Sequence, residues 1–184
     1  MSVKIDKKKS VEKERLIFKP NWEYILEKAY ETFIYLGWTI ATIAVILNPK
    51  NAINHTATLI VILINILLLI SWYYIYKLLK INISKPERDR KLFVEILKNR
   101  FPELIINDNG LHMLRSKKNT GSLSWGKLLT VIFDENYLFI NLATLGRYGN
   151  KSPFHAISNY LKLKSIEKEF NNRIVISDKS VATD

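Results

Sequence analysis

The chain has 184 residues, a net charge of +11 and no cysteine. Without cysteine it cannot form disulfides, thiolate metal sites or a thiol nucleophile. The length allows one domain of ordinary size, or a smaller domain with a membrane anchor.

The basic excess is concentrated in one part of the chain. Residues 77–100 carry 8 basic and 3 acidic side chains, whereas residues 101–184 carry 11 and 8. A nucleic-acid-binding domain would carry its excess on the soluble part, whereas anionic lipid head groups attract basic residues beside a membrane segment. The distribution favours a membrane surface as partner and argues against nucleic acid.

Two charge-free runs, residues 32–49 and 51–76, follow a basic N-terminal segment at 1–31. A bilayer core of about 30 Å needs about 20 helical residues, and backbone groups in lipid must hydrogen-bond within their own segment. The sequence predicts transmembrane helices at 32–47 and 56–76, joined by a loop at 48–55. A buried core helix and a signal peptide are weaker interpretations, because two runs follow a long charged lead.

The flanks of the two runs predict how they are oriented. The end of the second run carries Trp72, Tyr73, Tyr74 and Tyr76. Lys77 and Lys80 follow, and aromatic residues with cations just beyond them anchor a helix end at an interface. Basic residues gather on both flanks but not in the loop. The positive-inside rule therefore predicts a multi-pass protein of the cytoplasmic (inner) membrane with both termini in the cytoplasm and an external loop.

The polar and small residues of the spans are few. Asn65 lies near the middle of the second run, and Gly37 lies in the first. Small residues permit close helix approach and Asn can hydrogen-bond between helices, so we interpret them as packing positions of a hairpin or a homo-oligomer. A transport path is disfavoured because neither run contains an ionisable residue.

Residues 77–101 are predicted to form a basic juxtamembrane linker and a helix. Pro86 suits the first turn, Glu87 and Asp89 suit its positive dipole end, and Pro102 stops it. Cations of this segment are expected to contact anionic lipid head groups. They are Lys77, Lys80, Lys85, Arg88, Arg90 and Lys91.

Downstream of Pro102 the apolar pattern becomes that of short strands. Asn109-Gly110 between apolar runs is a strong hairpin signal, because both residues accept positive φ. Further turns are expected at 117–121 and 134–136. Strands are expected at 103–107, 111–115, 122–125, 128–133, 137–142 and 173–177, and a helix at 154–170. Residues 102–184 are thus predicted to form a small antiparallel β-meander, curved into a barrel or half-barrel, which makes the chain an α+β membrane protein.

This pattern resembles the pleckstrin-homology-like (PH-like) domain of small bacterial membrane proteins in which two transmembrane helices precede a cytoplasmic domain. The matching positions are Asn109-Gly110-Leu111, Gly121, Leu123, Trp125, Val131 and residues 174–177. The resemblance implies a PH-like fold. Two features depart from it. The chain ends seven residues after Ser177, where a closing C-terminal helix is expected, so the helix at 86–101 or that at 154–170 covers the barrel end, or the end stays open. The only basic pair near a phosphate-binding turn is Lys117-Lys118, which we interpret as a solvated turn.

No catalytic pattern emerges. His55, His112 and His155 lack metal-site spacing, and no nucleophile elbow or glycine-rich phosphate loop is present. We expect no enzyme activity, metal or cofactor. The sequence favours a membrane-anchored cytoplasmic interaction module with an unidentified protein partner. The alternative is a small membrane effector, such as an immunity protein, that acts through its transmembrane helices.

Overall fold

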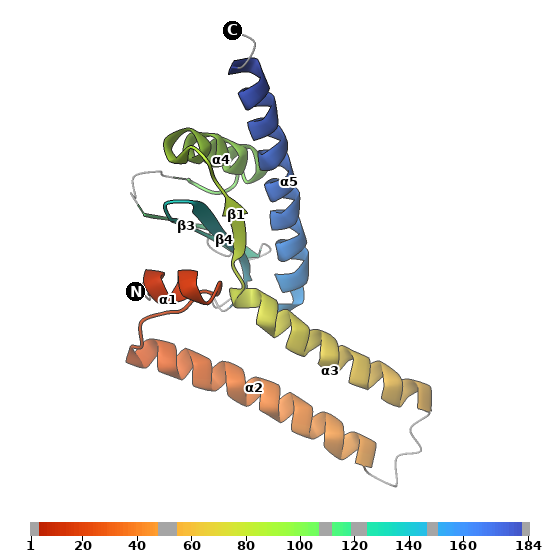
Figure 1. Ribbon diagram of the computed structural model, residues 1–184. Coiled ribbons are helices and arrows are strands. Elements are labelled where there is room, and N and C mark those ends of the chain that lie inside the picture. Colours follow the sequence, from red (N-terminus) through yellow and green to blue (C-terminus); the bar gives the residue numbers. More distant parts are fainter. Residues whose placement is uncertain (1–3, 48–54, 107–111, 119–124, 147–150, 182–184) are drawn as a thin grey trace.

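The computed structural model describes residues 4–47, 55–106, 112–118, 125–146 and 151–181. These residues form an α+β domain from which two long helices extend together (Figure 1). In chain order the elements are α1 (Lys7–Glu12), α2 (Trp22–Leu47), α3 (His55–Tyr76), β1 (Leu79–Asn82), α4 (Pro86–Arg100), β2 (Met113–Lys118), β3 (Gly126–Phe133), β4 (Tyr137–Leu145), the 3-10 turn η1 (Pro153–His155) and α5 (Ala156–Val181).

The domain is built on one antiparallel sheet of four strands in the order β1-β4-β3-β2. The predicted turn at 134–136 joins β3 to β4, and the register places Phe133 opposite Leu138. Within the described residues the sheet is open and consists of these four strands. The predicted α+β class with an antiparallel meander is therefore confirmed at this level.

Both faces of the central strands are buried, which explains why β3 and β4 are nearly continuous apolar runs. Alternate residues point to opposite faces of a sheet. One face, including Leu129, Val131 and Ile140, packs against α4 and α5. The other face, including Ile132 and Phe139, packs against the N-terminal segment and the end of α3. Figure 1 shows α4 and α5 on one side of the sheet, with α1 and the two long helices on the other.

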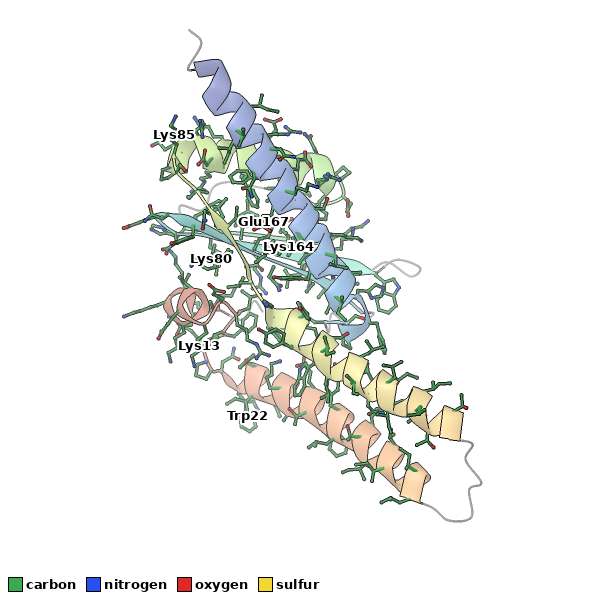
Figure 2. All side chains as sticks on the ribbon, turned by 45° about the vertical axis from the view of Figure 1, so that its right-hand side comes forward. Lys13, Trp22, Lys80, Lys85, Lys164 and Glu167 are labelled. Atoms are coloured by element: carbon green, nitrogen blue, oxygen red, sulfur yellow. The ribbon has the colours of Figure 1, made fainter. Side chains whose placement is uncertain are left out.

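Helices α2 and α3 run side by side away from the domain in both views (Figures 1 and 2). The rings of Tyr35 and Trp72 stack with centroids 4.7 Å apart, and the Asn65 amide lies 3.5 Å from the Thr42 hydroxyl. Among the described residues one stretch has the length and apolarity to cross a bilayer, residues 58–76, of which only 11% is buried. A soluble core helix would be mostly buried, whereas this stretch is mostly exposed.

Helix α2 begins ten residues before the predicted start at 32. Its first turns carry charged residues, and Lys28 pairs with Glu31. The Tyr76 hydroxyl donates to the Glu31 carboxylate at 3.1 Å. Residue 31 thus lies level with the end of α3, and the part of α2 before it lies beside the domain.

Several predicted boundaries are wrong. The linker assigned to 77–85 contains strand β1, and the predicted strand at 103–107 is absent from its described part, 103–106. Strand β2 runs through Lys117-Lys118, which were assigned to a turn. The Asn109-Gly110 hairpin lies outside the described residues, as do positions 122–124 of a further predicted strand.

The largest error concerns the C-terminal region. Residues 173–177 were predicted to be a strand but belong to α5, which continues to Val181. The β-branched run of Ile174, Val175 and Ile176 suggested the strand. Val175 and Ile176 are 54% and 68% exposed and pair with no strand, so the helix simply continues past Phe170. The last strand of the described residues is β4, and a long helix, α5, follows it.

Candidate membrane-facing site

The end of α3 is fixed to the sheet by one buried side chain. The last carbonyls of a helix have no partner within the helix. The Asn141 amide of β4, 2% exposed, donates to the carbonyl of Ile75 at 3.0 Å and to that of Lys77 at 2.9 Å. Ile75 also belongs to the core below the sheet. The apolar helix and the domain are thus one continuous unit.

The N-terminal segment pairs with the chain where it leaves α3. The backbone N–H of Leu16 donates to the Tyr76 carbonyl at 2.8 Å, and that of Leu78 donates to the Glu14 carbonyl at 2.9 Å. This pairing places Arg15 opposite Lys77 in an antiparallel bridge. This pairing has no local signal in the sequence, because the apolar run Leu16-Ile17-Phe18 is only three residues long and stands between charged residues.

Cations surround the aromatic residues at this junction. The Lys77 ammonium lies 5.2 Å from the Tyr73 ring centre and 5.4 Å from those of Tyr74 and Tyr160. The ammonium groups of Lys28 and Lys151 lie 3.8 and 4.0 Å from the Tyr76 ring centre. Aromatic rings attract cations through their quadrupole. Lys77 is one of the cations predicted to contact lipid head groups, which stays a prediction. Lys28 and Lys151 were not in that set, because tertiary folding brings them to Tyr76.

An open recess of about 500 Å³ lies between the N-terminal segment and the last turn of α3. Its lining residues are Glu12, Lys13, Glu14, Arg15, Tyr73 and Lys77. The Glu14 carboxylate lies 3.6 Å from the Lys80 ammonium, on the neighbouring strand β1. The recess adjoins the end of the apolar stretch, because Tyr73 and Lys77 are among its lining residues.

The six cations predicted to contact lipid do not lie together. Lys77 and Lys80 are at the junction with α3, where the Lys80 ammonium also lies 4.0 Å from the Tyr137 ring centre. Figure 2 shows Lys80 between the hairpin and Lys85, which lies at the end of the domain away from the hairpin. The other three belong to α4, which packs on the opposite face of the sheet (Figure 1). They are Arg88, Arg90 and Lys91.

Two of the α4 cations have structural contacts. Arg88 binds Asp89, whose carboxylate is fully buried and also accepts the backbone N–H groups of Ser84 and Lys85 at 2.9 Å. The Arg90 guanidinium lies 4.1 Å from the Phe133 ring centre. Arg90 lines a second recess, of about 410 Å³, together with His112, Asp134 and others, and no residue of α3 is among its lining residues. Lys91 is exposed.

Large apolar side chains are exposed next to the end of α3. Phe154 of η1 is 76% exposed and Leu161 of α5 is 62% exposed. Element η1 packs against α3, and the Tyr160 ring lies 4.8 Å from that of Tyr74. Trp125, 55% exposed, contacts the His155 ring at 5.2 Å. The side of the domain beside α3 is therefore aromatic and apolar as well as basic.

Shifted carboxyl groups mark structural ion pairs on the domain. The hydrogen bond from Arg100 and the charges of Arg100 and Arg173 lower the pKa of Glu169, against the opposing effect of burial. For Glu103, burial alone would raise the pKa, but the hydrogen bond and charge of Lys127 outweigh it and the pKa is lowered. Both pairs join elements of the domain, and neither lies beside a nucleophile or a metal-ligand cluster. No group of three or more metal-ligating side chains gathers in the described ranges.

Comparison of the chain with protein-family models, with curated proteins and with solved structures gives no significant match. The functional assignment therefore depends on the residues of this chain.

Proposed function

We propose that this protein is a membrane-anchored interaction module, in which a two-helix transmembrane hairpin holds the α+β domain at the cytoplasmic surface. Residues 32–47 and 58–76 would span the bilayer, with the loop at 48–55 outside. We also propose a PH-like relationship for the domain, supported by the order of three meander strands followed by a C-terminal helix and by the matching positions Trp125 and Val131; the matching positions 174–177 lie in α5 and give it no support. The partner that the domain binds would be a cytoplasmic protein.

The observation that carries the proposal is the continuity between α3 and the sheet. Asn141 holds the carbonyl of Ile75 in α3 and that of Lys77 just after it, and the side chains of Ile75, Tyr76 and Leu78 complete the core below the sheet. A helix joined to the domain by a flexible linker would not contribute side chains to the domain core. A rigid connection supports a role in presenting the domain in a fixed orientation at the membrane.

The hairpin topology can be tested with single cysteines, because the chain has none of its own. Asn51→Cys lies in the loop expected outside, and Ser165→Cys lies on an exposed position of α5. In intact bacterial cells, a membrane-impermeant maleimide should label residue 51 at once. It should label residue 165 only after the membrane is permeabilised.

Labelling of residue 165 in intact cells would contradict the cytoplasmic placement of the domain. Protection of residue 51 until permeabilisation would contradict the two-span hairpin. Extraction of the full chain from membranes by alkaline carbonate would show a peripheral protein and overturn the anchor itself.

A further inference from the structure

We infer that the recess between the N-terminal segment and α3 is a binding site for the phosphate of an anionic phospholipid, held by Arg15 and Lys77. The inference rests on the proposed membrane-anchored function. In place of a diffuse basic surface, one defined site would bind the phosphate. Arg15, from the N-terminal segment, would contribute to this site.

The backbone fixes the two cations side by side. Arg15 and Lys77 are directly opposite each other in an antiparallel bridge, and side chains in such pairs project to the same face. The guanidinium carbon of Arg15 lies 5.7 Å from the Tyr73 ring centre, and the Lys77 ammonium lies 5.2 Å from it. The two cations therefore flank one aromatic ring at the wall of the recess.

The end of α1 is what turns Arg15 towards α3. The N–H of Arg15 donates to the Ser10 carbonyl at 3.0 Å, and that of Glu14 donates to the Val11 carbonyl at 3.2 Å. These two bonds form the Schellman motif that ends many helices. Glu14 holds its left-handed position with φ of 47°, where glycine is more usual. The reversal brings the chain back against the residues that follow α3.

The charge of the recess is arranged to accept an anion. Within the described residues, neither Arg15 nor Lys77 forms an ion pair with a carboxylate. Of the two acidic residues in the lining, Glu14 is turned to Lys80 at 3.6 Å and Glu12 is exposed to solvent, so the three lining cations outnumber the carboxylates. Lys13 contributes a third cation, and Figure 2 shows it near the start of α2, on the hairpin side of the domain. At 5.7 Å from the Tyr73 ring centre, the guanidinium keeps N–H groups available for bidentate contact with phosphate oxygens.

The position of the recess at the end of α3 favours a lipid as the source of that phosphate. Tyr73 and Lys77 belong to the last turn of the apolar stretch and the residue after it, and Tyr73 is 50% exposed. Aromatic residues and cations at the end of a membrane helix lie at the head-group level. A volume of about 500 Å³ that opens at this level can admit a glycerophosphate head group while its acyl chains remain beside α3.

The test uses native mass spectrometry of the full-length protein in detergent micelles. Phosphatidylglycerol and phosphatidylcholine with the same acyl chains are added in equal amounts, and the bound lipids are counted for each variant. Wild type should retain one phosphatidylglycerol in preference to phosphatidylcholine. The Arg15→Gln/Lys77→Gln variant should bind it about thirtyfold more weakly, as expected for the loss of two charges in a head-group field.

Lys91→Gln/Lys98→Gln is the matched control, because it removes the same charge from exposed positions of α4, on the other face of the sheet. It should bind phosphatidylglycerol as wild type does. The charge-conserving Arg15→Lys variant tests whether the fork of the guanidinium matters. Because Arg15→Lys keeps the net charge of the chain, it also serves as the test if the double variant does not fold. We expect Arg15→Lys to bind phosphatidylglycerol severalfold more weakly than wild type.

Equal binding by wild type, the double variant and Arg15→Lys would overturn the site. An equal loss in the α4 control would overturn it too, because only the overall charge would then matter. Displacement of the lipid by millimolar inorganic phosphate would point to a soluble phosphate compound and overturn the lipid assignment. The measurement needs no knowledge of topology, so failure here leaves the cysteine-labelling result intact.

Discussion

At the scale of single residues, Asn141 links the end of α3 to the sheet. Its amide satisfies two carbonyls at the end of α3 from a position that is 2% exposed. A buried polar group that loses its partner costs about 1–3 kcal/mol. Leucine has a similar volume but no donor, so Asn141→Leu leaves both carbonyls unpaired.

We expect Asn141→Leu to lower the melting temperature of the full chain in detergent by several degrees, which corresponds to a loss of a few kcal/mol in a protein of this size. Asn99→Leu, on an exposed position of α4, serves as the control and should change stability by less than about 0.5 kcal/mol. A melting temperature of Asn141→Leu equal to that of wild type would show that the two hydrogen bonds of Asn141 contribute nothing to stability.

Glu169 gives a second prediction at this scale, about pH. Its carboxylate accepts from Arg100 Nε at 2.8 Å and from the Arg173 guanidinium at 3.0 Å, and its pKa is lowered. The folded pKa is then below the unfolded value near 4.5, so the stabilisation is present above pH 4.5 and is lost as pH falls through the folded pKa. The Glu169→Gln variant lacks this ion-pair stabilisation at every pH.

The difference in melting temperature between wild type and Glu169→Gln should therefore be largest near neutral pH and should shrink below about pH 4.5. Glu135→Gln, in the exposed turn between β3 and β4, removes one carboxylate elsewhere as a control. A difference that stayed constant between pH 7 and pH 3 would rule out the ion pair as its origin.

At the scale of elements, the core between the helices and the sheet depends on α5. Phe170 is fully buried and meets the Phe93 ring of α4 edge to face at 5.3 Å. We expect Phe170→Ala to cost about 3–5 kcal/mol of unfolding free energy, because it removes a large core side chain and leaves a cavity. Lys168→Ala, on an exposed position of the same helix, should cost less than about 0.5 kcal/mol. Denaturant unfolding in detergent measures both, and a loss below 1 kcal/mol for Phe170→Ala would contradict this packing.

The elements that sequence reasoning found are those with a strong local signal. Continuous apolar runs and the turn at 134–136 predicted β3 and β4, and the Pro86 start with one apolar stripe predicted α4. Strand β1 was missed because it has four residues and directly follows an apolar helix. The end of α5 was mistaken for a strand because propensity is local, whereas the decision between helix and strand depended on whether a sheet partner existed.

At the scale of the whole molecule, the sequence predicted an apolar hairpin and a separate cytoplasmic domain but not how they join. The contacts that join them link Arg15 with Lys77 and Asn141 with Ile75, residues far apart in the chain. Such pairings follow from closing the core and leave no periodic pattern in any one segment. For the same reason the predicted lipid-contacting set was drawn from one contiguous stretch, and the fold divides it between the two faces of the sheet.

Under the proposed membrane anchor, the fixed junction predicts how the domain is oriented on the bilayer. Because η1 packs against the end of α3, the exposed Phe154 and Leu161 should lie at the lipid surface, whereas α4 should face away from it. Amphipathic and aromatic side chains are stable at the head-group level. Single cysteines at 154, 161 and, as control, at Lys91 can each carry an environment-sensitive fluorophore in the full chain reconstituted into vesicles.

Lipids that carry a nitroxide near the head group should quench the labels at 154 and 161 several times more strongly than the label at 91. The fluorescence emission of the labels at 154 and 161 should also be shifted to shorter wavelength relative to the free fluorophore in water. Equal quenching at all three positions would mean that the domain does not keep the orientation that the α3 junction imposes. Stronger quenching at 91 would invert the orientation and place α4, with Arg90 and Lys85, against the lipid.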